Sequence, residues 1–166
     1  MPPLRRAATL VSASAIFVSP CTATLLATAS AQADNKRLND SVVANIYTIQ
    51  HQAGCTNDVH INPQLRLAAQ WHTADVLTNR ALDADTGSDG STVQDRTDAA
   101  GFRGVATETV AINPALAING IEIMNQWYYR PDYMAIMADC ANTQIGVWSE
   151  NSLDRSVVVA VYGRPA

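Results

Sequence analysis

The segment QIGVWSENSLDRSVVVAVY, residues 144–162, decides the fold class that we expect. Its two β-branched ends, residues 144–149 and 156–162, are typical of strands, and the polar residues between them are typical of a turn. Upstream, apolar side chains recur at helical spacing over residues 35–52 and 63–80. Because helices come first and an antiparallel pair of strands comes last, the sequence predicts an α+β fold.

Shorter elements are expected between these segments. Asn62-Pro63 and Asn113-Pro114 both have the pattern of a helix start, with Asn as the cap and Pro at the first helical position. The second pair predicts a helix that begins at Ala115 and continues to Pro131. The remaining expectations are a loop over residues 55–61, a short helix over 91–100, a strand over 106–112 and a turn over 132–138.

The amino terminus has the layout of a secretory signal peptide. Arg5 and Arg6 form a basic start, an apolar stretch follows, and small-x-small sites allow cleavage after Ala31 or Ala33. We therefore expect a leader over residues 1–33 and a single domain over residues 34–166. An uncleaved membrane helix and a lipid anchor on Cys21 are the alternatives. Pro20 and the scattered Ser and Thr residues shorten the apolar run below the length of a membrane span, so the uncleaved helix ranks second. We expect no stable transmembrane span after cleavage.

Export changes how the cysteines are interpreted. Removal of the leader takes Cys21 with it and leaves Cys55 and Cys140. In an oxidising compartment, such a pair is most simply a disulfide. Two buried thiols, or a metal pair with His51 or His60, are the alternatives, but the spacing is not that of a structural zinc site.

The charge of the chain argues against two classes of partner, nucleic acids and anionic lipids. The formal net charge is −4, and after residue 33 nine basic and fifteen acidic side chains remain. Nucleic-acid binding needs clustered Lys and Arg, so a nucleic-acid partner is not expected. The sequence also has no polybasic patch for anionic lipid.

The large aromatic side chains and one histidine are assigned to the core. Trp71, Trp127 and Trp148 are expected to be buried, with exposure of Trp148 in a binding surface as the alternative. His72 lies on the apolar stripe of the second helix and is interpreted as a hydrogen-bonded core histidine. Arg96, in Asp95-Arg96, is assigned a structural role that ties the short helix to its neighbours.

Six stretches in a fixed order carry a resemblance to a known family. The chain resembles the bacterial branch of the CAP superfamily, which includes the cysteine-rich secretory proteins, insect antigen 5 and plant pathogenesis-related proteins. The resemblance covers residues 35–163 and implies an α-β-α sandwich with a central cleft. The stretches are Asn62-Pro63-x-Leu65-x-x-x-Ala69-x-x-His72-x-x-Asp75, the run from Thr86 to Thr92 with Asp95-Arg96, Ala100-Gly101-Phe102, Glu108-Thr109-Val110-Ala111, Trp127-x-x-x-Pro131 and Ile145-Gly146-Val147.

The resemblance also implies where the cleft residues lie. Many family members line the cleft with two His and two Glu that can hold zinc. Here the first His position holds Asp85, the first Glu is retained as Glu108, the second Glu position holds Arg130 and the second His position holds Tyr133. A guanidinium repels a metal ion, so we expect no metal and no other cofactor. We expect Arg130 to pair with Glu108, Asp85 or both, which would lower the pKa of Glu108.

The acidic loop before the short helix offers a further alternative. Asp83, Asp85 and Asp89 superficially resemble a calcium loop, but the position of the closing Glu holds Arg96. A solvated turn is the preferred interpretation.

Three functions remain open from the sequence. The first is a non-catalytic protein, secreted or associated with the cell envelope, that binds a small apolar ligand or an envelope or host protein through its cleft or surface. The second is a hydrolase or peptidase that depends on Glu108. The third is a stable structural component of the envelope. We favour the first, because the cleft lacks metal-competent imidazoles and the sequence has none of the common catalytic motifs.

Overall fold

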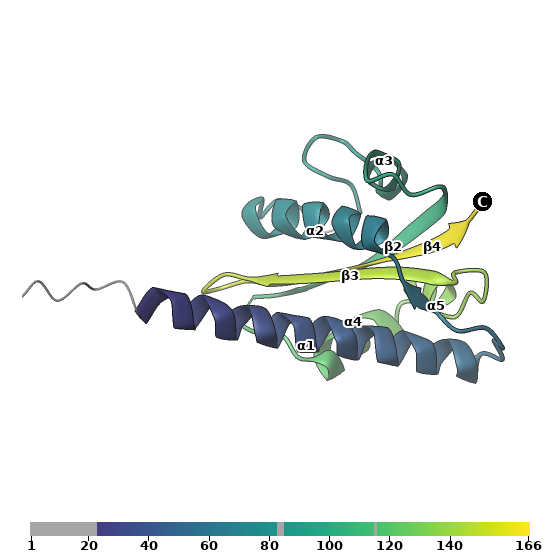
Figure 1. The fold of residues 1–166 in the computed structure, drawn as a ribbon, viewed down its shortest axis with the longest axis horizontal. Coiled ribbons are helices and arrows are strands. Elements are labelled where there is room, and N and C mark those ends of the chain that lie inside the picture. The colour runs from purple at the N-terminus through teal and green to yellow at the C-terminus, as the bar shows by residue number, and fades with distance from the viewer. Residues whose placement is uncertain (1–22, 83–84, 115) are drawn as a thin grey trace, which may run out of the picture.

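The computed structural model describes residues 23–82, 85–114 and 116–166, and a four-stranded sheet lies at its centre (Figure 1). The strands are β1 (His60–Ile61), β2 (Gly104–Asn113), β3 (Gln144–Asn151) and β4 (Ser156–Pro165). They lie in the order β1-β3-β4-β2. β1 is parallel to β3, and the other neighbours are antiparallel.

The hairpin predicted from residues 144–162 is confirmed as β3 and β4. Its register runs from Gln144 opposite Gly163 to Asn151 opposite Ser156. β4 lies between β3 and β2 and is covered on both faces, which explains its unbroken apolar sequence. Alternate side chains of β4 therefore enter two different cores.

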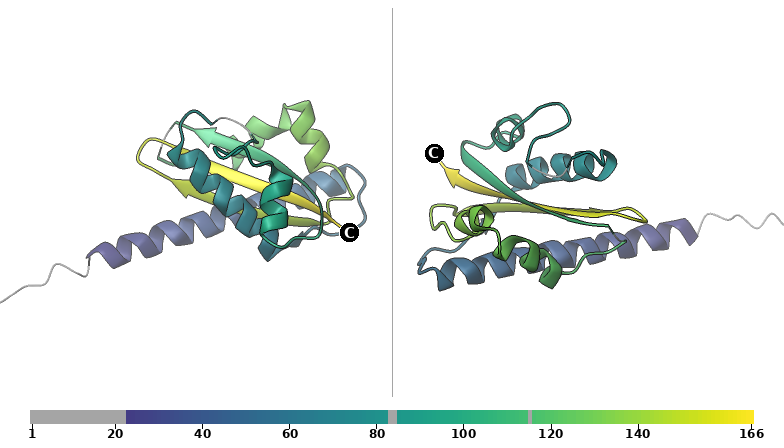
Figure 2. Two further views of the ribbon diagram at one scale, coloured as in Figure 1. Left: turned by 90° about the horizontal axis from the view of Figure 1, so that it is seen from above. Right: turned by 180° about the vertical axis from the view of Figure 1, so that it is seen from behind.

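Helices cover both faces of the sheet (Figures 1 and 2). α2 (Pro63–Thr78) and α3 (Val93–Ala99) lie on one face, where Val157, Val159 and Val161 of β4 meet Leu65 and its neighbours. α1 (Ala23–Gln52), α4 (Gly120–Tyr128) and α5 (Pro131–Met137) lie on the other face, around Val158, Ala160 and Tyr162. The α+β class and the α-β-α sandwich are therefore confirmed.

β1 was missed by the sequence analysis, which expected a loop over residues 55–61. The strand has two residues, too few to produce an alternating pattern. It exists because β3 offers a hydrogen-bonding edge: His60 N donates to Thr143 O at 2.9 Å, and Asn62 N donates to Ile145 O at 2.8 Å. Asn62 then caps α2 through hydrogen bonds from Gln64 N and Leu65 N to its side chain.

α1 begins at Ala23, twelve residues before the predicted start at position 35. The added segment is rich in Ala and Leu, which are good helix formers. Both expected cleavage sites, after Ala31 and after Ala33, fall within this helix, whereas residues 1–22 of the expected leader lie outside the described residues. Of the helices that the structure describes, none is long and apolar enough to cross a membrane.

The start of α4 was predicted wrongly. Asn113 ends β2 instead of beginning a helix, and its side-chain amide donates to Ala117 O at 2.9 Å. α4 begins after Asn119, which forms a capping box with Glu122. The turn expected over residues 132–138 is the helix α5.

The predicted disulfide is confirmed. Cys55 and Cys140 are bonded with a Cα–Cα distance of 5.2 Å, and the bond joins the end of α1 to the segment after α5. The prediction for the tryptophans was right only for Trp127, which is fully buried. Trp148 is half-buried, and Trp71 lies on the outer side of α2 with 42% of its surface exposed.

Candidate functional site

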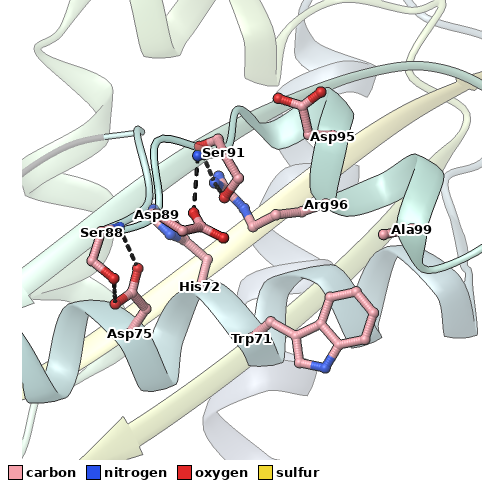
Figure 3. Close-up of a pocket in the computed structure, with 9 residues that line it drawn as sticks. All are labelled: Trp71, His72, Asp75, Ser88, Asp89, Ser91, Asp95, Arg96 and Ala99. Atoms are coloured by element: carbon pink, nitrogen blue, oxygen red, sulfur yellow. Dashed lines mark hydrogen bonds between the residues drawn. The ribbon is translucent and has the colours of Figure 1, made fainter.

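Side-chain hydrogen bonds hold the second half of the loop between α2 and α3 (Figure 3). Ser88 donates to the carboxylate of Asp75 on α2 from both its backbone N and its Oγ, each at 2.7 Å. Ser91 N donates to Asp89 Oδ1 at 2.9 Å. These bonds fix the path of the chain between Asp85 and α3.

The carboxylates of this loop do not converge. Asp89 accepts from Ser91, and Asp85 accepts from a tyrosine on the other side of the sheet edge. Asp83, the third residue of the calcium alternative, lies outside the described residues. Within the part of the chain that the structure describes, no three His, Cys, Asp or Glu side chains form a metal-binding group.

Glu108 is paired with Arg96, not with Arg130 as predicted. Glu108 is on β2, and its side chain is buried beneath α2 and α3. Arg96 Nη2 donates to Glu108 Oε1, and the same guanidinium donates to Asp85 O at 2.9 Å and Ser91 O at 2.8 Å. His72 Nε2 lies 3.8 Å from Glu108 Oε1. Arg96 thus ties the loop, α3 and β2 to one buried carboxyl.

The pKa of Glu108 is raised, whereas the sequence analysis expected it to be lowered. Burial raises it to about 8, and the nearby charge of Asp85 adds to this effect. Arg96 lowers the pKa through its charge and hydrogen bond, but these contributions are smaller than the effect of burial. The free-energy cost of removing the Glu108 carboxylate from water is therefore larger than the stabilisation that the charge of Arg96 provides.

Asp85, Tyr133 and Arg130 form a second group, which we call the Tyr133 cluster. Tyr133 Oη donates to Asp85 Oδ1 at 3.1 Å. The guanidinium of Arg130 lies over the Tyr133 ring, with Cζ 3.5 Å from the ring centroid, and it pairs with Asp132. Burial and the charge of Asp85 raise the pKa of Tyr133 to about 12, so the phenol is protonated at neutral pH.

Asp85 connects the two groups. Its carbonyl oxygen accepts from Arg96, and its carboxylate accepts from Tyr133. The structure therefore brings Asp85, Arg130 and Tyr133 into one chain of contacts, and it joins Glu108 to them through Arg96. Sequence reasoning placed Arg96 in a purely structural role. That role is what the structure shows, but no local pattern linked Arg96 to Glu108, twelve residues away, because their contact depends on the packing of α3 on β2.

A cleft of about 510 Å³ opens beside the Tyr133 cluster, and we call it the arginine cleft. It lies along β2, where Gln126 of α4 exchanges two hydrogen bonds with the backbone of Ile112. Arg130 is the member of the Tyr133 cluster that lines it. The lining residues are Arg80, Leu82, Val110, Ile112, Gln126, Arg130 and Arg155.

A second cleft, of about 460 Å³, lies between α2 and α3 on the other side of the loop (Figure 3). Trp71 forms part of its wall, and Asp75, Asp89 and Asp95 lie around it. Asp75 and Asp89 already accept hydrogen bonds from the loop serines, and Asp95 accepts from Thr92. Its carboxylates therefore serve the local fold.

The sequence matches no protein-family profile, and the comparison with curated proteins finds no relative. Solved structures do resemble the chain. An extracellular protein of Bacillus anthracis that contains an SCP domain superposes with a TM-score of 0.68 at 14% identity, over 88% of this chain and 45% of that one. A cysteine-rich secretory protein of Staphylococcus aureus superposes with a TM-score of 0.57 at 10% identity, over 76% and 38%.

The chain has a CAP fold. An outer surface protein of Borrelia burgdorferi is similar over 75% of this chain and 90% of its own length, with a TM-score of 0.64 at 17% identity. By contrast, this chain spans less than half of the Bacillus and Staphylococcus chains. At such identities the likeness establishes the CAP fold, and the function must be argued from the residues.

The zinc ion that the family resemblance implies does not fit these residues. At the positions expected to hold the metal, Arg130 brings a positive charge and Tyr133 donates a hydrogen bond to Asp85. Glu108, the retained position, is engaged by Arg96. A zinc site needs about four N, S or O ligands, and this arrangement satisfies its own charges instead.

Proposed function

We propose that this chain is an exported CAP-fold protein that binds a ligand or a partner protein through its arginine cleft and does not catalyse a reaction. The observation that carries the proposal is that each of the four family-equivalent residues already has a partner within the protein. Arg130 covers Tyr133, Tyr133 binds Asp85, and Glu108 is paired with Arg96. Arg130 also lines the arginine cleft, whose volume of about 510 Å³ is that of a small-molecule site.

Export is supported by three independent features. Residues 1–33 have the layout of a cleavable leader, and Cys55–Cys140 is the kind of bond that persists in oxidising compartments. The similar structures are described as an outer surface protein, an extracellular protein and a secretory protein. The intact mass of protein recovered from the culture medium or envelope should correspond to a chain that begins at Gln32 or Asp34. A chain that retains Met1 would refute cleavage.

Binding is tested on the mature protein by native mass spectrometry after gentle purification from its exported fraction. We expect a bound species that is lost on denaturation and is reduced when Arg130 is replaced by Gln. The matched control is Arg164→Gln, which removes another half-exposed arginine paired with an aspartate, Asp139. Equal retention of the bound species in both variants would place binding elsewhere.

A Glu108-dependent hydrolase is the second candidate, because one observation favours it. A carboxyl with a pKa of about 8 next to a histidine can act as a general acid near neutral pH. The side chain of Glu108 is only 1% exposed, so a substrate would reach it only if the loop before α3 moved. Hydrolysis of a peptide or ester by the wild type, lost in Glu108→Gln, would make this the leading function.

A further inference from the structure

We propose that the arginine cleft recognises an oxyanion, a carboxylate or a phosphate, that is carried on an apolar group. This inference rests on the proposed binding function and specifies the chemistry of the ligand. It follows from three features of the lining: its charge, the state of one buried arginine, and the apolar floor.

The charge of the lining is opposite to that of the whole protein. The chain has a formal net charge of −4, yet three of its eleven basic side chains line this cleft and none of the lining residues is acidic. Guanidinium groups are suited to carboxylates and phosphates, because each presents N–H donors in a planar fork.

Arg155 is a buried cation without a carboxylate partner. It is 7% exposed, and no carboxylate of the described residues lies within 4 Å of it. Its Nη2 donates to Leu82 O at 2.8 Å and its Nη1 to Arg80 O at 3.5 Å, while Nε has no hydrogen-bond partner. A buried charge of this kind is costly unless an opposite charge is near. An anion in the cleft would supply that charge.

Arg80 and Arg130 can each offer N–H donors to an anion without leaving their present partners. Arg80 pairs with Asp154 through Nη2, and Arg130 pairs with Asp132 through Nε and Nη2. Both pairs are about half exposed, and exposed ion pairs contribute at most about 1 kcal/mol. Each guanidinium has five N–H donors, so these pairs leave donors for a ligand.

Three acidic side chains oppose an anion here, and each is already engaged: Asp154 pairs with Arg80, Asp132 pairs with Arg130, and Asp85 bonds to Tyr133. The charge of Asp85 acts on Arg130, but the Asp85 carboxylate accepts the Tyr133 hydroxyl. The hydrogen bond holds this carboxylate toward Tyr133, and Asp85 is not among the lining residues.

The apolar residues on the floor of the cleft favour a ligand with an apolar group. Leu82, Val110 and Ile112 line it, and all three belong to or pack against the core between the sheet and α2. Burial of an alkyl or aromatic group on this floor would contribute about 25 cal/mol per Å² of apolar surface. The volume of about 510 Å³ is within the range of small-molecule sites. A compact amphiphile with one anionic end matches both the charge and the floor.

Isothermal titration calorimetry on the mature protein tests the proposal with four probes: octyl phosphate, octanoate, inorganic phosphate and octyl glucoside. We expect saturable binding of octyl phosphate or octanoate, at least tenfold weaker binding of inorganic phosphate, and no binding of the neutral glucoside. Because the attraction is electrostatic, affinity should fall as salt is added.

The variant Arg80→Gln/Arg130→Gln should weaken binding of the anionic amphiphile by at least tenfold. Both residues are exposed, so the variant should fold, which circular dichroism checks. Arg164→Gln, outside the cleft, should bind like the wild type.

The outcomes separate the inference from the proposed function. Binding of octyl glucoside that is unaffected by the double arginine variant would overturn the anion inference and leave a binding function in place. Equal affinity for inorganic phosphate and octyl phosphate would overturn the role of the apolar floor. Binding of none of the probes would overturn the inference, while a bound species seen by native mass spectrometry would still support the proposed function.

Discussion

Glu108 is the residue on which opposing physical effects meet. Burial and Asp85 favour its neutral form, while Arg96 favours its charged form, and burial has the largest effect. A carboxyl with a raised pKa binds its proton more tightly in the folded protein than in the unfolded chain. It therefore stabilises the fold fully below about pH 4.5, the ordinary value, and this contribution is lost as the pH rises through about 8.

Glu108→Gln should flatten the pH dependence of stability across this window. In the wild type, the free energy of unfolding should fall by at most about 1.4 kcal/mol per pH unit between pH 5 and 8 from this group. Gln keeps an oxygen for Arg96 and has no proton to lose. Urea denaturation at several pH values measures the difference, and identical slopes in the two proteins would contradict a raised pKa.

Glu108→Ala provides the contrast. It leaves a buried Arg96 N–H donor without its acceptor, which should cost about 2 kcal/mol in urea denaturation at pH 5 relative to Glu108→Gln, because Gln keeps an acceptor there.

At the scale of elements, the short helices depend on their caps. α3 has seven residues and α4 has nine, lengths at which an isolated helix does not form in water. Both begin with a capping box, Thr92 with Asp95 and Asn119 with Glu122. These caps set the helix phase and so the direction in which Arg96 and Trp127 point.

Asn119→Ala should destabilise the protein by about 1 kcal/mol, because Ile121 N and Glu122 N lose their acceptor. Asn113→Ala removes one exposed hydrogen bond outside a helix and should cost less. Thermal or urea unfolding compares the two. A larger effect at Asn113 would mean that the Asn-Pro pair is the true start of the helix.

The contact between α2 and β3 depends on the absence of a side chain at position 146. A Cβ on Gly146 would lie 2.0 Å from Arg66 N and 2.2 Å from Leu65 C, which are backbone atoms. Gly146→Ala must push α2 away from the sheet and should cost about 3 kcal/mol.

Gly163→Ala is the matched control on the neighbouring strand. Its added Cβ would meet Leu65 Cδ1 at 2.6 Å and Phe102 Cζ at 2.7 Å, both side-chain atoms that can move. It should therefore cost less than Gly146→Ala in urea denaturation. The reverse order would show that α2 is not in close contact with β3.

At the scale of the whole molecule, the disulfide ties together the helical layer formed by α1, α4 and α5. It links α1 to the segment after α5 across 85 positions of sequence. In the chain-entropy account, a loop of this length restricts the unfolded chain strongly.

The double variant Cys55→Ser/Cys140→Ser should lose about 4 kcal/mol of stability, measured by urea denaturation without reductant. Adding a reductant should destabilise the wild type and leave the variant unchanged. An equal response of both proteins to the reductant would contradict the bond.

The sequence by itself determined the elements whose signals are local. The β-branched hairpin after Gln144, the Asn62-Pro63 helix start and the Thr92 cap all act within a few residues, so their patterns specified them. The disulfide also followed, because the interpretation of residues 1–33 as a leader left two cysteines to pair. β1 was missed because it forms only on the edge of β3, which is distant in sequence. The start of α4 was missed because the Asn113-Pro114 pair has the stronger pattern of a helix start.

Only the tertiary structure decided which charges meet. The sequence analysis offered Arg130 as the partner of Glu108 or Asp85, but the packing of α3 on β2 buries Arg96 against Glu108 and leaves Arg130 on the surface beside Tyr133. The protonation of Glu108 likewise depends on how completely water is excluded by α2, α3 and the loop. Burial is a property of all the surrounding chain, and no local pattern of residues encodes it.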